Sequence, residues 1–350
     1  MLTELNKNYQ NKFPFVVFSN PHNSKVTGYF QKDGKNYASD EFENDKVVLA
    51  PFNFENALFC IPKVESEVIE YEIEKKSISE VKIPLAENKE DQQQHLDIIR
   101  LSKKVIGSRK ANKIVVSRRK DVPITNLDLS VIFIRLFNLY PNAYRYIWYH
   151  PETGVWCGAS PEILLKTENT SFETMALAGT QVYNPKRAAI WTDKEREEQQ
   201  IVTDAITSNL QKVTSVVKIS KTYDHKAGAL VHLRTDISGI LKRNKATVNS
   251  VAKALHPTPA VCGTPQKEAK KFILENEGYN REFYTGFIGK INTKNQESEL
   301  YVNLRCMKLE EGIASLYVGG GITNQSVAED EWLETHNKLQ TMLQVLEPLL

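Results

Sequence analysis

The apolar segments of this 350-residue chain are short, and amphipathic helices lie between them in no regular order. Residues 15–18, 46–50 and 68–73 have the length, composition and flanking turn residues of strands in an antiparallel meander. A parallel doubly wound sheet would need strands and helices in strict alternation, which the sequence lacks. The pattern therefore predicts an α+β fold built on antiparallel strands.

The chain is long enough for one large domain or for two of ordinary size. The sequence has no internal repeat, and no run rich in proline, glycine or serine divides it. We therefore expect a single domain over residues 1–350.

Composition excludes several classes of partner. The net charge of +2 gives no reason to expect nucleic acid, and no apolar run is long enough to span a membrane. The four cysteines are far apart, form no C-x-x-C motif and have apolar or small neighbours, which is typical of buried free thiols in a reducing compartment. We expect a soluble cytoplasmic protein.

The glycine run 319–321 leads into the last helix, whose apolar residues recur at helical spacing. Glu331, Glu334 and Lys338 form a second stripe beside the apolar one. They are either a solvated lattice of ion pairs or the wall of a polar site, and this helix alone does not distinguish the two. The glycines do not form a G-x-G-x-x-G fingerprint, so we reject a nucleotide site and expect a close approach of the backbone to a helix or a ligand.

A helix beginning near Thr192 repeats this pattern, and Thr192-Asp-Lys-Glu195 is a capping-box sequence. Glu195 and Glu198 are three residues apart, and Glu198 shares a face with Ile201/Val202 and Ala205, which should be buried. A buried carboxylate needs a partner, because desolvating an unpaired charge is very costly. Two Glu-x-x-Glu helices offer the oxygen ligands that Mg²⁺ prefers. A shared Mg²⁺ site is one interpretation, and charges on two helix surfaces are the other.

Three further residues carry possible chemistry. Lys113 opens an apolar strand, where a lysine is usually exposed but could serve as a base if it were held among apolar side chains. Glu162 opens another strand after a tight turn and is either a surface acid or a proton donor. Arg305, expected in the middle of a strand over 300–309, should pair with a carboxylate of the protein or of a ligand.

In their order along the chain, nine segments resemble motifs of the chorismate-utilising enzymes, most closely the isochorismate synthases. The segments are residues 113–118, 158–165, 177–180, 193–198, 255–263, 280–286, 304–306, 319–322 and 331–335. The resemblance implies one domain in which antiparallel sheets pack as a sandwich flanked by helices. It places the catalytic motifs in residues 96–350 and a variable group of strands in residues 1–95.

The activity that the resemblance implies is the Mg²⁺-dependent isomerisation of chorismate to isochorismate. Lys113 corresponds to the base that activates water for attack at ring carbon C2, and Glu162 to the acid that protonates the departing C4 hydroxyl. These residue types suit the chemistry, because hydroxide is a poor leaving group and water is a weak nucleophile.

The resemblance also implies a binding site for the metal and the substrate. Glu198 and Glu334 correspond to direct Mg²⁺ ligands, and Glu195 and Glu331 to acids that act through metal-bound water. Chorismate carries two carboxylates, and a metal together with cationic side chains would offset both charges. The residues implied to line the substrate pocket are Gly179, Thr180, Ala260, Val261, Tyr284, Arg305, Gly319 and Lys338.

Sister activities remain alternatives. The aminating relatives usually work with a glutaminase subunit, and the aminodeoxychorismate synthases carry a nucleophilic lysine where this chain has Ala178. We expect no glutaminase partner and a monomer. Salicylate synthase is the nearest rival, because it makes isochorismate before eliminating pyruvate, and a non-catalytic chorismate-binding protein is a remote one. The sequence leaves open whether the product feeds menaquinone or siderophore synthesis.

Overall fold

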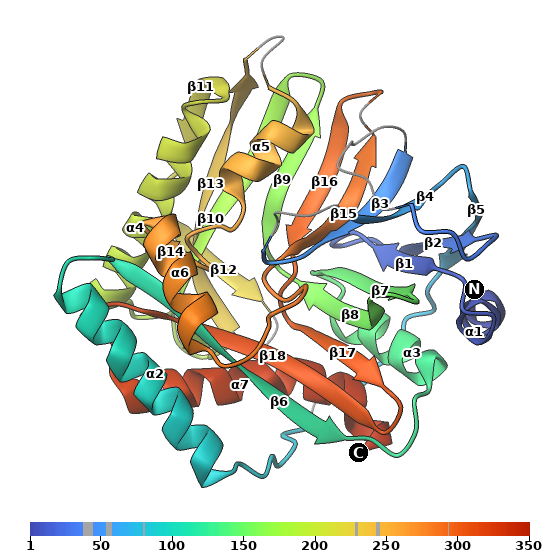
Figure 1. The fold of residues 1–350 in the computed structure, drawn as a ribbon, viewed down its shortest axis with the longest axis horizontal. Coiled ribbons are helices and arrows are strands. Elements are labelled where there is room, and N and C mark those ends of the chain that lie inside the picture. Colours follow the sequence, from blue (N-terminus) through green and yellow to red (C-terminus); the bar gives the residue numbers. More distant parts are fainter. Residues whose placement is uncertain (38–44, 54–57, 80, 228–229, 243–245, 293) are drawn as a thin grey trace.

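The computed structural model describes residues 1–37, 45–53, 58–79, 81–227, 230–242, 246–292 and 294–350. Their strands form two large antiparallel sheets that face each other, and helices cover the outer faces (Figure 1). This confirms the α+β class and the single sandwich-like domain. None of the helices in the described ranges is both long and apolar enough to cross a membrane.

Sheet 1 contains strands from both ends of the chain. Its order is β14 (Gly263–Thr264), β6 (Lys113–Pro123), β18 (Ile313–Ile322), β17 (Cys306–Glu310), β8 (Gly154–Ser160), β7 (Tyr144–His150), β1 (Phe15–Ser19), β2 (Lys25–Gln31) and β5 (Ser66–Glu72). The long pairing of β6 with β18 sets Gly321 opposite Val115. It therefore places the glycine run beside the strand that Lys113 opens.

Sheet 2 contains the remaining strands. Its order is β11 (Thr214–Ile219), β13 (Leu230–Leu241), β10 (Ser171–Val182), β9 (Ile163–Glu168), β16 (Glu297–Val302), β15 (Phe287–Asn292), β3 (Asp45–Ala50) and β4 (Phe59–Pro62), and β12 (Tyr223–Ala227) also pairs with β13. In the pairing of β10 with β13, Thr180 lies opposite His232, next to a register shift between Ala178 and Thr180.

Aromatic side chains fill much of the space between the sheets. Tyr144 of sheet 1 stacks on Tyr301 of sheet 2 with ring centroids 4.3 Å apart, and Trp156 stacks on Tyr317 at 5.3 Å. Both sheets contribute to this buried cluster, so apolar burial holds them face to face.

The helices are α1 (Leu2–Gln10), α2 (Lys89–Gly107), α3 (Leu129–Leu139), α4 (Asp193–Leu210), α5 (Val248–Leu255), α6 (Gln266–Asn276) and α7 (Ala328–Leu346), and the 3₁₀ turn η1 (Glu347–Leu349) follows. Helices α2, α3, α6 and α7 pack on sheet 1, whereas α4 and α5 pack on sheet 2. The two helices with the Glu-x-x-Glu pattern, α4 and α7, therefore belong to different layers.

The expected strand over 300–309 is wrong. The chain leaves sheet 2 at the end of β16 and enters sheet 1 at β17, and Arg305 lies in the crossing with a φ of +48°. Both halves are apolar, so their pattern does not reveal the change of sheet. Arg305 is thus a residue of the sheet junction, not of a strand centre.

Helix α2 begins at Lys89, because the side chain of Asn88 accepts a hydrogen bond from the Glu90 amide and caps the helix. After α4 the chain forms the strands β11, β12 and β13. All four cysteines are free and buried, as expected.

Candidate active site

A cavity lies where the two sheets meet beneath α4 and α7. Eleven of the residues that the resemblance implied line it together: Glu162, Gly179, Thr180, Glu198, Ala260, Val261, Tyr284, Arg305, Gly319, Glu334 and Lys338. They come from segments spread over more than 170 positions of the chain, so only the tertiary fold assembles them.

Lys113 reaches this site through a buried ion pair. Its Nζ lies 2.9 Å from Oε1 of Glu198, and the side chains are 1% and 12% exposed. The usual exposure of strand-end lysines does not hold here, because the Glu198 carboxylate compensates for the loss of hydration. The pair also provides the partner that a buried Glu198 was expected to need.

The glycines of β18 allow this close packing. A Cβ at Gly321 would collide with Oε1 of Glu198 and would approach Cε of Lys113 to 2.7 Å, and one at Gly320 would lie 3.0 Å from Oε2 of Glu331. The backbone of the strand therefore lies directly against two carboxylates, those of Glu198 and Glu331. This is the close approach that the glycine run predicted.

On α7, Glu334 and Lys338 lie one turn apart and face the cavity. The Lys338 ammonium donates to Oε1 of Glu334 at 2.6 Å and to the Gly319 carbonyl at 2.9 Å. Lys338 thus ties the helix to β18 and brings a positive charge to the cavity wall. The stripe on α7 is a polar wall, not a solvated lattice.

Glu331 is nearly inaccessible, with 2% exposure, and Oε1 lies 2.8 Å from the Lys194 ammonium of α4. Burial and the neighbouring Glu334 charge raise its pKa, and Lys194 acts in the opposite direction. The Lys194–Glu331 pair therefore joins α4 to α7. Sequence reasoning missed Lys194, whose place in the first turn of an exposed-looking helix gave no signal.

Glu195 has a different position. Its Oε2 accepts hydrogen bonds from the Thr192 amide at 2.9 Å and from the Thr192 hydroxyl at 2.6 Å, as the capping box predicted. The side chain is half-buried and is not among the described residues that line the cavity. Its carboxylate is already occupied by the helix cap.

Glu162 is the most perturbed acid of the site. The residue is 3% exposed, and the Thr258 hydroxyl, 3.5 Å from Oε1, is its hydrogen-bond donor among the described residues. Burial raises the pKa of its carboxyl to about 8, although Lys113 and Thr258 favour the charged form. A carboxyl with this pKa carries its proton at neutral pH and can donate it.

Arg305 and His232 bring free donor or acceptor atoms to the cavity wall. Within the described part of the chain, Nη1 of Arg305 and Nε2 of His232 are buried and have no hydrogen-bond partner. Nδ1 of His232 lies 2.9 Å from the Gly179 carbonyl, and burial lowers the pKa of the imidazole to about 3. Sequence reasoning missed His232, because only the register with β10 brings it to the site.

The carboxylate oxygens that α4 and α7 bring to the glycines of β18 fit a hard cation, because such a cation prefers oxygen ligands. In this structure three of the acids are each paired with a lysine: Glu198 with Lys113, Glu331 with Lys194 and Glu334 with Lys338. The described residues contain no cluster of three His, Cys, Asp or Glu side chains arranged to hold a metal. A metal would therefore have to displace ammonium groups.

Residues 53–347 match the family model of the chorismate binding enzymes. The chain belongs to the chorismate-binding enzyme family. It is 32% identical over 244 residues to isochorismate synthase EntC of Escherichia coli K12, a match that covers 67% of this chain and 62% of EntC. The match thus spans about three fifths of that relative's length.

Two solved structures have this fold over nearly the whole chain. DhbC from Bacillus anthracis superposes with a TM-score of 0.83 at 25% identity, covering 99% of this chain and all of that one. MenF from Escherichia coli, the menaquinone-specific isochorismate synthase, gives a TM-score of 0.80 at 22% identity and covers 96% and 89%. The likeness to MenF concerns the fold alone.

Proposed function

We propose that this protein is an isochorismate synthase, which converts chorismate to isochorismate by addition of water at C2 and loss of the C4 hydroxyl. The observation that carries the proposal is that Glu162, whose burial raises its pKa, lies in one cavity with the cations Arg305 and Lys338. An acid can expel hydroxide, and two cations can hold a dianion. Family membership and the similarity to EntC support the same reaction.

In the proposed mechanism, Glu162 gives its proton to the departing C4 hydroxyl, and Lys113 takes a proton from the attacking water. A lysine acts as a base only in its neutral form. Burial of both groups keeps bulk water from competing with the intended proton transfers. The free Nη1 of Arg305 and the ammonium of Lys338 would hold the substrate carboxylates.

We propose Mg²⁺ as the cofactor, with Glu198 and Glu334 as direct ligands and Glu195 and Glu331 acting through bound water. The metal would supply positive charge for one substrate carboxylate. In this structure Lys113 and Lys338 pair with the two proposed direct ligands, Glu198 and Glu334. Both ammonium groups would lose these partners if Mg²⁺ were bound. Glu195 could take this role only if its carboxylate served the helix cap and the water together.

We also propose a division of labour along the chain, with residues 96–350 as the catalytic part and residues 1–95 as support. In support of this, every lining residue of the cavity in the described chain lies after residue 96, whereas the earlier strands extend both sheets. Water is the nucleophile, so the enzyme would need no glutaminase, and we propose that it acts as a monomer. Four free thiols suit a reducing cytoplasm.

The test is incubation of the purified protein with chorismate, with and without Mg²⁺, followed by chromatography of the products. The proposal expects isochorismate only when Mg²⁺ is present. Salicylate with pyruvate as the main enzymatic product would identify a salicylate synthase instead. Chorismate bound without any conversion would indicate a binding protein.

A further inference from the structure

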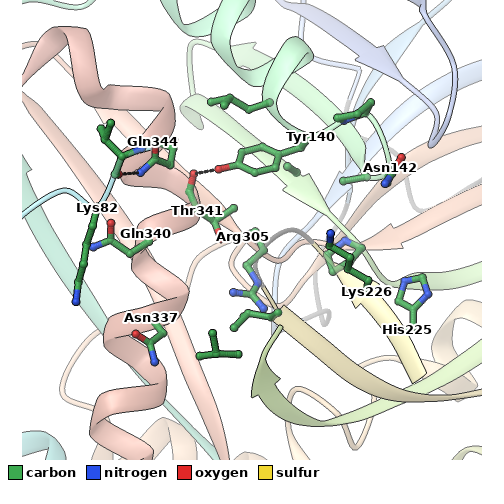
Figure 2. A pocket seen from close by; sticks show the side chains of 18 residues that line it. Lys82, Tyr140, Asn142, His225, Lys226, Arg305, Asn337, Gln340, Thr341 and Gln344 are labelled. Carbon is green, nitrogen blue, oxygen red and sulfur yellow. Dashed lines mark hydrogen bonds between the residues drawn. The ribbon is translucent and has the colours of Figure 1, made fainter. Parts of the chain in front are cut away.

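A second and larger cavity, of about 350 Å³, adjoins the catalytic one. Arg305 and Pro161 line both cavities, so the two spaces share a wall. Figure 2 shows Arg305 between α7, which carries Asn337 and Gln340, and the segment that carries His225 and Lys226. We call this larger cavity the vestibule. Its volume is within the range of pockets that hold small organic ligands.

The charge of the vestibule has one sign. Among its described lining residues are the cations Lys82, Lys226 and Arg305, and none is an aspartate or a glutamate. Lys82 and Lys226 are exposed, and the pKa of His225 is lowered mainly by burial. The lining of the catalytic cavity differs, because it contains both acids and cations. An anion in the vestibule would therefore meet attraction from several sides and repulsion from no described lining residue.

Hydrogen bonds brace the vestibule wall. The Gln340 side chain accepts from the Ile83 amide at 3.1 Å and donates to the Ile83 carbonyl at 3.0 Å. One turn later, Gln344 makes the same pair of bonds with Val81. These two pairs of hydrogen bonds hold the segment that bears Lys82 against α7. Figure 2 shows Lys82 beside Gln340 and Gln344 of this helix. The wall is thus formed before any ligand arrives.

We propose that the vestibule is the route by which a dianionic substrate reaches the catalytic cavity, with Lys82 and Lys226 as the first electrostatic contacts and Arg305 as the shared inner contact. This inference rests on the proposed function, because chorismate is the dianion in question. A cavity lined by one charge sign raises the local concentration of the opposite ion and speeds its association. The apolar part of the lining, which includes Leu139 and Leu230, would accept the carbon ring.

Selective labelling tests the route. All four native cysteines are buried, so Asn337→Cys offers one accessible thiol in the vestibule. A bulky maleimide on this cysteine should abolish most of the activity of the same variant measured before labelling, and chorismate should slow the labelling. Labelled Glu173→Cys is the control, because Glu173 is exposed and lines a separate groove on sheet 2. Full activity of labelled Asn337→Cys, or no protection by chorismate, would overturn the proposal.

Charge reversal tests the steering. Lys82→Glu combined with Lys226→Glu should lower kcat/KM about tenfold at low ionic strength. The loss should shrink as salt rises, because the Debye length falls to about 3 Å at 1 M. Lys166→Glu with Lys290→Glu is the matched control, with the same change in net charge at the separate groove. Equal losses in both pairs would refute a specific path. Wild-type turnover in the same assay tests the proposed function separately.

Discussion

Replacing Glu162 by glutamine removes the proton-donating group and nearly preserves its shape. The carboxyl is buried, and burial raises its pKa from the ordinary 4.5 to about 8. Glutamine does not titrate, so the variant should lose the pH dependence that this one group gives to activity and to stability. The two effects are measured separately, and each has a predicted sign.

The stability effect follows from proton linkage. Between pH 4.5 and about 8 the folded protein keeps the Glu162 proton and the unfolded chain has lost it, so the free energy of unfolding falls as pH rises. The contribution is full below pH 4.5 and is lost by about pH 8. Each pH unit is worth about 1.4 kcal/mol, so wild type should lose roughly 3 kcal/mol relative to Glu162→Gln between about pH 5.5 and 8.5.

Urea unfolding of both proteins at these two pH values, without substrate or metal, measures the difference. Other titrating groups are common to the two proteins and cancel. A difference in unfolding free energy that stayed constant with pH would refute the buried, protonated carboxyl.

The effect on activity is measured with substrate and Mg²⁺ present, whereas the unfolding experiment contains neither. Loss of a general acid lowers turnover by about 10² to 10⁴. Wild-type turnover should also decline above about pH 8, where Glu162 loses its proton. Retention of wild-type turnover by Glu162→Gln would remove this residue from the acid role.

Two further changes test the site, and a third tests a buried ion pair of the fold. Gly321→Ala should greatly weaken activity, because its Cβ would collide with Glu198, whereas Gly107→Ala, with open space at its Cβ, should not alter it. Glu198→Gln should shift the Mg²⁺ dependence of turnover to higher concentration, and an unchanged titration would exclude it as a ligand. Arg281→Met should lower the free energy of unfolding by about 3–5 kcal/mol, because the buried Glu277 carboxylate, 2.5 Å from this guanidinium, would lose its cationic partner. Urea unfolding checks that value, and a loss below about 1 kcal/mol would contradict it.

Much of the fold could be predicted from local patterns. Antiparallel strands, the capping box at Thr192 and the burial of Glu198 are properties of short segments, and the structure confirms them. The prediction of one strand over 300–309 was wrong for a non-local reason. Its two halves are both apolar, and only the packing of two sheets decides that the chain bends at Arg305.

For the candidate site, too, some residues could be predicted from the sequence and others could not. The resemblance indicated which acids, lysines and glycines to expect, because motifs record residue types in order along the chain. It did not indicate His232, which enters the site through strand register, or Lys194, whose importance depends on a buried acid from another helix. The pairing of Glu198, Glu331 and Glu334 with lysines is likewise a property of the assembled layers.

The sequence by itself determined the fold class, the family motifs and the candidate groups, because hydrophobic period, turn residues and motif order are local information. Only the tertiary structure decided that burial raises the pKa of Glu162, that Lys113 is buried against Glu198 and that a cationic vestibule adjoins the cavity. Desolvation and charge pairing depend on distances between segments far apart in the chain, and the sequence does not contain those distances.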